Sequence, residues 1–279
     1  MRPLEEQTVL VTGSTDGLGK GVATELAARG ATVLLHGRDN ARLDATAEAI
    51  HEETGSQRIA CYRADLSSLC DVRLLAENVA DTEQSIDVLV NNAGIVAGSQ
   101  RELSRDGYEL TFVVNHLSHF LLTVLLLPLL RTETPARIVN VASGAQSAID
   151  FDDVMLDHGY DPLRAYGQSK LAQIMFIFEL AERLERQGYD GVSVNALHPA
   201  TFMDTKMVRE SFGTPTSSVA EGVEATMRLI ASRRVRGASG RYYSGKREAG
   251  THPQAGDEDA CHRLWSLSSE LSAAAVATQ

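Results

Sequence analysis

The sequence predicts an α/β protein in which helices cover both faces of one parallel sheet. Strand-length runs rich in valine, isoleucine and leucine alternate with helix-length amphipathic segments along the chain. The runs are short and continuously apolar, which is typical of strands buried on both faces. No linker rich in proline, glycine and serine and no internal repeat interrupts the alternation. We therefore expect one doubly wound domain over residues 1–279, with about seven parallel strands.

Four strands are expected in the first half of the chain, about 1–135, each followed by a helical segment. The strands are TVLVTG (8–13), ATVLLHG (31–37), RIACYRAD (58–65) and IDVLVNNAG (86–94), and the segments after them are 17–29, 40–54, 68–83 and 104–131. The second half, about 136–279, is expected to hold strands at 137–143, 192–199 and 241–245. Helices are expected there at 163–187, 218–233 and 257–275.

Composition argues against several functional classes. The chain is 43% hydrophobic and carries a formal net charge of -11, which disfavours nucleic acid and anionic membranes as partners. Cys61, Cys70 and Cys261 lack the spacing of metal ligands and are interpreted as reduced thiols, so no metal is expected. The start of the chain does not resemble a signal peptide, and the apolar run 120–130 is shorter than the roughly 20 residues of a membrane span. These features predict a cytoplasmic protein without a membrane span.

A glycine-rich loop, VTGSTDGLGKG (11–21), follows the first strand and opens the first helix. Its glycines at 13, 17, 19 and 21 fit neither Gly-x-Gly-x-x-Gly nor the Walker pattern. At this place in a doubly wound fold, free backbone N–H groups and the helix dipole bind phosphates, and glycines allow close approach. The loop predicts a pyrophosphate site, although a flexible turn alone would explain the same glycines.

The second strand ends in HGRD (36–39), at the position that separates the two nicotinamide cofactors. A carboxylate here binds the ribose 2′-hydroxyl of NAD, whereas an arginine accommodates the 2′-phosphate of NADP. Arg38 with Gly37 before it therefore favours NADP(H) over NAD(H). The alternative is that Arg38 is a solvated charge and Asp39 binds the ribose.

Four polar residues form a candidate catalytic group. Tyr166 and Lys170, in AYGQSK (165–170), lie one helical turn apart. Lowering a tyrosine pKa by about three units takes roughly 4 kcal/mol, which a buried ammonium and a positive nicotinamide ring together could supply. Ser143 ends the fifth strand and could donate to a substrate oxygen, and Asn115, a poor helix former within a predicted helix, could hold a proton-carrying water. Taken singly, each of these residues could equally be structural.

In this order the motifs resemble the short-chain dehydrogenase/reductase family, which has a Rossmann fold. Its phosphate loop, Thr-Gly-x-x-x-Gly-x-Gly, matches Thr12 to Gly19, and its further elements match ADLSS around Asp65, NNAG (91–94) and HP (198–199). The resemblance implies a cofactor-binding first half and a catalytic and substrate-binding second half. It implies that Asn115, Ser143, Tyr166 and Lys170 are catalytic, with Tyr166 as acid/base. The cofactor-binding residues that it implies are Gly13, Ser14, Thr15, Asp16, Gly17, Leu18, Gly19, Arg38, Asp65, Leu66, Asn92, Ala93, Gly94, Tyr166, Lys170, Pro199 and Thr201.

Three longer stretches resemble the branch of retinol dehydrogenases, protochlorophyllide reductases and the WW-domain oxidoreductase. They are NHLSHFLLTVLLLPLL, SKLAQIMFIFELAERL and YYSG…DEDACHRLWSLS, and the long gap between Ser143 and Tyr166 agrees with them. The resemblance implies hydride transfer between a nicotinamide cofactor and the carbonyl or alcohol group of a small molecule. Arg38 favours NADP as that cofactor, and Met203 and Met207 indicate an apolar substrate pocket. The alternatives are a carbon–carbon double-bond reductase and an NADP-binding sensor without turnover.

Two departures from the family pattern affect the cofactor site. Asp16 stands where many NADP-dependent relatives carry a basic residue, and Ala200 replaces the usual glycine after Pro199. Either Thr201 or Thr205 is expected to contact the nicotinamide amide. Segment 201–217 is expected to form a substrate lid, and the alternative is an ordinary surface loop. The apolar segment 117–130 could build a homodimer or homotetramer, as its family counterpart commonly does, or be buried within one subunit.

Overall fold

A single sheet organises the part of the chain that the computed structural model describes, residues 2–130, 135–189 and 191–277. Its strand order is β3-β2-β1-β4-β5-β6-β7-β8. The strands are β1 (Thr8–Val11), β2 (Thr32–Gly37), β3 (Ile59–Arg63), β4 (Val88–Asn91), β5 (Ala136–Val141), β6 (Val192–His198), β7 (Arg241–Ser244) and β8 (Arg247–Glu248). Strands β1 to β7 pair in parallel, which confirms the expected parallel sheet. The sequence did not predict β8, a two-residue strand that turns back antiparallel to β7.

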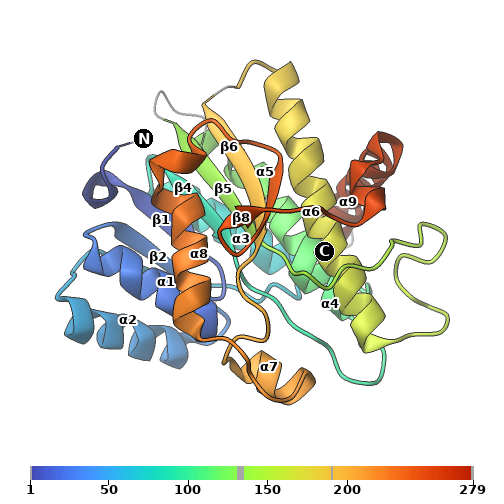
Figure 1. Cartoon of the computed structure of the whole chain (residues 1–279), viewed down its shortest axis with the longest axis horizontal. Coiled ribbons are helices and arrows are strands. Elements are labelled where there is room, and N and C mark those ends of the chain that lie inside the picture. The colour runs from blue at the N-terminus through green and yellow to red at the C-terminus, as the bar shows by residue number, and fades with distance from the viewer. Residues whose placement is uncertain (1, 131–134, 190, 278–279) are drawn as a thin grey trace.

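Helices cover both faces of the sheet (Figure 1). One face carries α1 (Gly17–Ala28), α2 (Asn40–Thr54) and α8 (Val219–Ala231), whose apolar residues form one core. The other face carries α3 (Leu69–Thr82), α5 (Ser118–Leu130) and α6 (Pro162–Arg186), and α9 (Glu258–Ala277) packs outside them against α6 and α3. Two short helices, α4 (Leu110–Phe112) and α7 (Lys206–Ser211), complete the α-helices of the described residues.

The helices begin where the sequence offers an N-cap. Asp39 accepts a hydrogen bond from the backbone of Arg42 at the start of α2, and Ser218 forms a capping box with Glu221 at the start of α8. Asp161 caps α6, and a proline occupies its first helical position, where a missing N–H costs nothing. These caps explain why the predicted and observed starts of the three helices differ by one residue or less.

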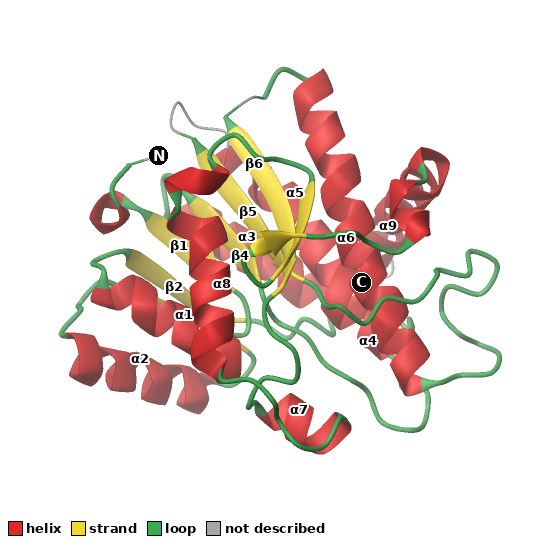
Figure 2. Ribbon diagram, in the orientation of Figure 1, coloured by secondary structure: helices red, strands yellow, loops and turns green. Residues whose placement is uncertain are grey.

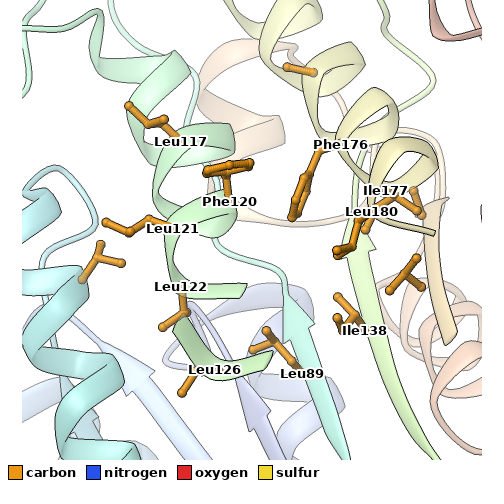
Figure 3. Packing of buried hydrophobic residues seen from close by; sticks show 14 of the residues in the cluster. Leu89, Leu117, Phe120, Leu121, Leu122, Leu126, Ile138, Phe176, Ile177 and Leu180 are labelled. Atoms are coloured by element: carbon orange, nitrogen blue, oxygen red, sulfur yellow. The ribbon is translucent and has the colours of Figure 1, made fainter. Parts of the chain in front are cut away.

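The larger core lies between α5, α6 and the sheet. Figure 3 shows Phe120 of α5 facing Phe176 of α6, and their ring centroids are 5.3 Å apart. Leu89 of β4 and Ile138 of β5 close the same cluster from the sheet. The leucines of α5 are therefore largely buried within one chain, and the homodimer or homotetramer stays a prediction.

The segment before α5 differs from its prediction in shape. Helix was expected from residue 104, but residues 104–109 form a turn that ends when Glu109 caps the backbone of Thr111 and Phe112. Residue 131, the expected end, lies outside the described residues. A π-helical turn (Val113–Leu117) joins α4 to α5, so the helical path runs from Leu110 to Leu130. With 21 residues and a mean hydropathy of 1.8, this path could cross a membrane by length and composition, but 78% of its apolar window is buried in the fold, which makes it weak support for a span.

The strand order reverses between β1 and β4, where one crossover leads outward to β2 and the other to β5. Loops that follow these two strands diverge and leave a crevice at their carboxyl ends. The glycine-rich loop follows β1 and the NNAG element begins at the last residue of β4, so both lie at this crevice.

Candidate active site

A cleft of about 700 Å³ opens at the carboxyl ends of the strands. The loops that follow the strands gather there with α7, at the lower end of the sheet in Figure 2. Most residues predicted for the cofactor and the reaction line this cleft. They are Gly13, Thr15, Asp16, Gly17, Leu18, Gly19, Arg38, Asp65, Leu66, Asn92, Ala93, Gly94, Ser143, Tyr166, Lys170, Pro199 and Thr201.

The glycine-rich loop is packed so closely that side chains would not fit. Gly13 has a φ of +64°, and a Cβ there would lie 2.9 Å from Ala93. A Cβ on Gly19 would lie 2.2 Å from the carbonyl oxygen of Gly13. The loop therefore needs glycine at both positions to bring bare backbone to the cleft, which is the arrangement that binds phosphate.

Ser14 and His36 hold this loop against β2. The Ser14 side chain is fully buried and does not line the cleft, and its hydroxyl accepts a hydrogen bond from the backbone N–H of His36 at 2.9 Å. The Nδ1 atom of His36 accepts from the backbone N–H of Gly13 at 3.1 Å, which requires an unprotonated Nδ1. Burial lowers the pKa of His36 to about 4, so the ring is neutral at physiological pH. His36 is not among the predicted site residues, because a histidine inside a strand gives no sign in the sequence of what it contacts.

Two guanidinium groups, from Arg38 and Arg42, lie at the end of the cleft next to β2. Asp16 contacts Arg42, with 3.2 Å between carboxylate oxygen and guanidinium nitrogen, and also caps α1 at Gly17. Asp16, the departure from the family pattern, thus lies beside a second arginine that the sequence analysis missed. A basic residue near the start of a helix is too common to stand out in a sequence.

Asp65 lies near these arginines. Burial opposes its ionisation, but hydrogen bonds from Ser67 and the nearby charges of Arg105 and Arg38 outweigh that effect and lower the pKa of Asp65. Asp39, by contrast, does not line the cleft, because its carboxylate caps α2.

The candidate catalytic residues come from three elements. Ser143 follows β5, and Tyr166 and Lys170 lie on the buried face of α6. Burial raises the pKa of Tyr166, and a hydrogen bond with the Ser143 hydroxyl acts in the opposite direction. The Lys170 ammonium lies 5.6 Å from the centre of the Tyr166 ring, and burial lowers its pKa to about 7. The described protein groups therefore keep Tyr166 protonated at neutral pH.

Asn115 lies in the π-helical turn, a distortion that often marks functional sites. Its side-chain amide exchanges two hydrogen bonds with the backbone of Ile95, at 2.8 and 3.0 Å, and donates to the Ser169 hydroxyl at 2.9 Å. It is fully buried and does not line the cleft. The amide thus fixes the chain after β4 against α6, and its role as a water carrier stays a prediction.

Segment 201–217 lies over the catalytic residues. The Phe212 ring stands edge-on to Tyr166 at 5.7 Å, and Phe202 follows at 5.8 Å from Phe212. Phe202 has a φ of +46°, a strained conformation for an aromatic residue. The Thr201 hydroxyl pairs with His198 at 3.0 Å, whereas the Thr205 hydroxyl caps α7. Both threonines line the cleft.

Comparison with known proteins identifies the family. Residues 7–215 match the family model described as short chain dehydrogenase. The chain is 38% identical to mouse (Mus musculus) retinol dehydrogenase 13 over 97% of its length and 85% of that protein, and 36% identical to human retinol dehydrogenase 14 over 94% and 85%.

Solved structures give the same result. An uncharacterized protein from Mycobacterium paratuberculosis superposes with a TM-score of 0.78 at 32% identity, covering 96% of this chain and 93% of that one. A short chain dehydrogenase from Shigella flexneri complexed with NADP has a TM-score of 0.71 at 25% identity, over 87% and 98%. The matched motifs, the fold and these relatives agree, and the chain belongs to the short-chain dehydrogenase/reductase family of oxidoreductases, in its retinol dehydrogenase branch.

Proposed function

We propose that the protein is an NADP(H)-dependent oxidoreductase that transfers hydride to or from an apolar carbonyl or alcohol, with Tyr166 moving the proton. One observation carries the proposal. Ser143, Tyr166 and Lys170 line the same cleft as the glycine-rich loop, so a nucleotide on that loop reaches the catalytic residues.

The cleft fits a dinucleotide phosphate. The glycine-rich loop offers bare backbone for the pyrophosphate, and Arg38 and Arg42 offer two guanidinium groups at the β2 end, where the 2′-phosphate of NADP binds in this fold. Asp39, the residue that could instead bind the ribose of NAD, is occupied at the cap of α2. Related structures complexed with NADP or NADPH support the same choice.

The chemistry divides among three side chains. A bound nicotinamide supplies or accepts the hydride. Ser143 donates a hydrogen bond to the substrate oxygen, and Tyr166, which burial keeps protonated, donates a proton to that oxygen during reduction. Lys170 places a positive charge beside the phenol and stabilises the phenolate that remains.

The substrate proposal follows from the lining. Apolar side chains of segment 201–217 and of the segment before α5 line the cleft, and Phe212 among them contacts Tyr166. They are Leu103, Leu110, Val114, Phe202, Met203, Met207, Val208 and Phe212. Such a surface favours an apolar ligand whose single polar group reaches Ser143 and Tyr166. Retinol, after which the curated relatives are named, has this character.

The role of Tyr166 can be tested by replacing it with phenylalanine. Tyr166→Phe removes the proton donor but not the ring, so we expect NADPH oxidation with an accepted carbonyl to fall at least about 100-fold. NADPH binding, measured by fluorescence titration, should stay within a few fold. Tyr108→Phe is the matched control, because Tyr108 lies outside the cleft. Unchanged turnover of Tyr166→Phe would contradict the proposed mechanism.

The NADP preference can be tested at the two arginines. Because a charge-assisted hydrogen bond is worth about 1.5–3 kcal/mol, Arg38→Ala and Arg42→Ala should each raise the Kd of NADPH roughly 10- to 100-fold. The Kd of NADH, which lacks the 2′-phosphate, should change little. Arg29→Ala, an exposed arginine paired with Glu25 on α1, serves as control. Equal losses for both cofactors would count against the preference.

A further inference from the structure

The buried ammonium of Lys170 has uncharged hydrogen-bond partners and, in the described part of the chain, no carboxylate beside it. Its ammonium donates to the backbone oxygen of Val141 at 3.0 Å and to Oε1 of Gln173 at 2.9 Å. Both acceptors are uncharged. The titratable groups that face it are Tyr166 of α6, His119 of α5 and His198 of β6, none of them a carboxylate.

Two of the three N–H bonds of this ammonium are therefore held by the protein. A Cβ built on Gly94 would lie 3.3 Å from the Lys170 nitrogen, and Gly94 and Lys170 line the cleft together. Gln173 does not line the cleft, so it contacts the ammonium from behind. The side chains of Gln173 and Lys170 thus form a pair, of which only the lysine faces ligands.

The buried side chain of Gln173 leaves one polar atom without a hydrogen-bond partner among the described residues. The side chain is fully buried on α6, one helical turn after Lys170, and the unpaired atom is Nε2. The opposite orientation of the amide would place an N–H group against the ammonium, so the oxygen must face Lys170 and leave the nitrogen unpaired. Leucine or methionine would fill the same space without a buried unpaired donor. Packing therefore does not explain this glutamine, and its contact with Lys170 does.

We propose that Gln173 is a positioning residue that fixes the Lys170 ammonium at the cleft and sets how readily it takes up a proton. The inference rests on the proposed function only for the role of Lys170 in turnover. Oε1 of Gln173 stabilises the charged form as a neutral dipole, without the full charge of a carboxylate. Stabilisation by a dipole instead of a full charge agrees with the pKa of Lys170, which burial lowers to about 7. That value lies within the pH range in which the enzyme is expected to work.

Lysine NMR can test the proposal without cofactor or substrate. The chain has only four lysines, at positions 20, 170, 206 and 246, so ¹³C-lysine labelling gives few signals, and Lys170→Ala assigns the buried one. Gln173→Met removes the acceptor at similar volume and should lower the titration midpoint of Lys170 by about one pH unit. Gln173→Glu places a carboxylate there and should raise it by about one unit or more. Shifts in opposite directions at one position are not expected from a general loss of packing.

Gln168→Met is the matched control. Gln168 is equally buried on α6, but its amide donates to the backbone of Val154 instead of contacting Lys170. The Lys170 midpoint should stay at its wild-type value in this variant. If Gln173→Glu does not fold, Gln173→Asn, whose amide is one methylene shorter, should shift the midpoint in the same direction as Gln173→Met.

Turnover gives the second readout. The pH dependence of kcat/KM should move with the Lys170 midpoint, down for Gln173→Met and up for Gln173→Glu. A midpoint that is the same in wild type, Gln173→Met and Gln173→Glu would overturn the inference. Opposite midpoint shifts combined with full turnover of Lys170→Ala would instead refute the proposed role of Lys170 and leave the contact with Gln173 established.

Discussion

At the scale of single residues, burial decides the properties of the candidate catalytic lysine. The pKa of Lys170 falls to about 7 because its ammonium loses solvent and gains no counter-ion. Sequence spacing correctly placed Tyr166 and Lys170 on one helix face, but the partners of Lys170 could not be predicted. Gln173 is one polar residue within a long helix, and its importance depends on which atoms of other elements surround it.

This burial makes the stability of the fold depend on pH through Lys170. The unfolded lysine binds its proton below about pH 10.4, whereas the folded one binds it only below about pH 7. Folding therefore carries a penalty that is complete below pH 7, decreases as the pH rises, and disappears above the unfolded pKa. Lys170→Met has no such penalty. We expect the unfolding free energy of the wild type, relative to this variant, to rise by about 4 kcal/mol between pH 7 and pH 10.

Urea unfolding at several pH values measures this difference. Lys246→Met is the control, because it also removes a lysine, but one that is half-exposed and paired with Glu224. A difference for Lys170→Met that does not change with pH would mean that Lys170 keeps an ordinary pKa in the fold.

At the scale of elements, α5 is connected to the glycine-rich loop through one histidine. Nδ1 of His119 contacts the carbonyl oxygen of Asn115 at 2.9 Å and must carry the proton, so Nε2 accepts from the Thr12 hydroxyl at 2.9 Å. The Thr12 oxygen in turn accepts the backbone N–H groups of Asn92 and Ala93. The structure shows that His119 links the loop after β1, the loop after β4 and the π-helical turn.

Replacing His119 and His116 one at a time should separate stability from cofactor binding. His119→Phe removes both hydrogen bonds of the ring, so we expect a loss of about 1–3 kcal/mol in unfolding free energy and a weakening of NADPH binding on the order of tenfold. His116→Phe lies three residues earlier in the sequence and loses only the contact with Ser268 on α9, at 2.8 Å, so cofactor affinity should not change. Unfolding curves and NADPH titrations measure the two effects. Equal NADPH affinities of the two variants would rule out a specific role for His119.

The same elements show how far sequence patterns reach. Strands β1 to β7 and the long helices were predicted within a few residues, except at the start of the segment that leads into α5, because buried parallel strands are continuously apolar and capping residues mark helix starts. The failures are local. The π-helical turn around Asn115, the short strand β8 and helix α7 within segment 201–217 have no periodicity long enough to detect.

At the scale of the whole molecule, the topology explains why most residues predicted for the site line one cleft. Residues distant in sequence, such as Gly13, Ser143 and Lys170, meet because each stands at or near the carboxyl end of a parallel strand or on the helix that covers it. Positions that depend on side-chain geometry were harder to predict. The Ser14 side chain is buried in the fold and does not line the cleft. Arg42 does line the cleft, where it forms an ion pair with Asp16.

Three buried histidines make the whole fold sensitive to acid. Burial is the main cause that lowers the pKa of His36 to about 4 and the pKa values of His116 and His119 to about 3. The unfolded chain protonates all three near pH 6.5, so the unfolded state binds more protons and stability falls as the pH drops from 6.5 towards 4. Glu109 acts in the opposite direction, because burial raises its pKa and the folded state takes up that proton first. The unfolded state then binds two to three more protons in total than the folded state. We therefore expect the unfolding free energy to fall by about 3–4 kcal/mol per pH unit between pH 6 and pH 4.5.

The unfolding free energy of the wild type between pH 7 and pH 4.5 tests this expectation. A typical domain is stable by about 5–15 kcal/mol, so the protein should unfold in mild acid, before most carboxylates are protonated. His116→Phe removes one of the three titrating groups without touching the cleft, and its slope should be about 1.4 kcal/mol per pH unit shallower than that of the wild type. Stability that stayed constant down to pH 4.5 would show that the rings gain protons inside the fold. Acid sensitivity would then have to come from carboxylates such as Asp65, whose lowered pKa costs stability only as the pH falls below about 4.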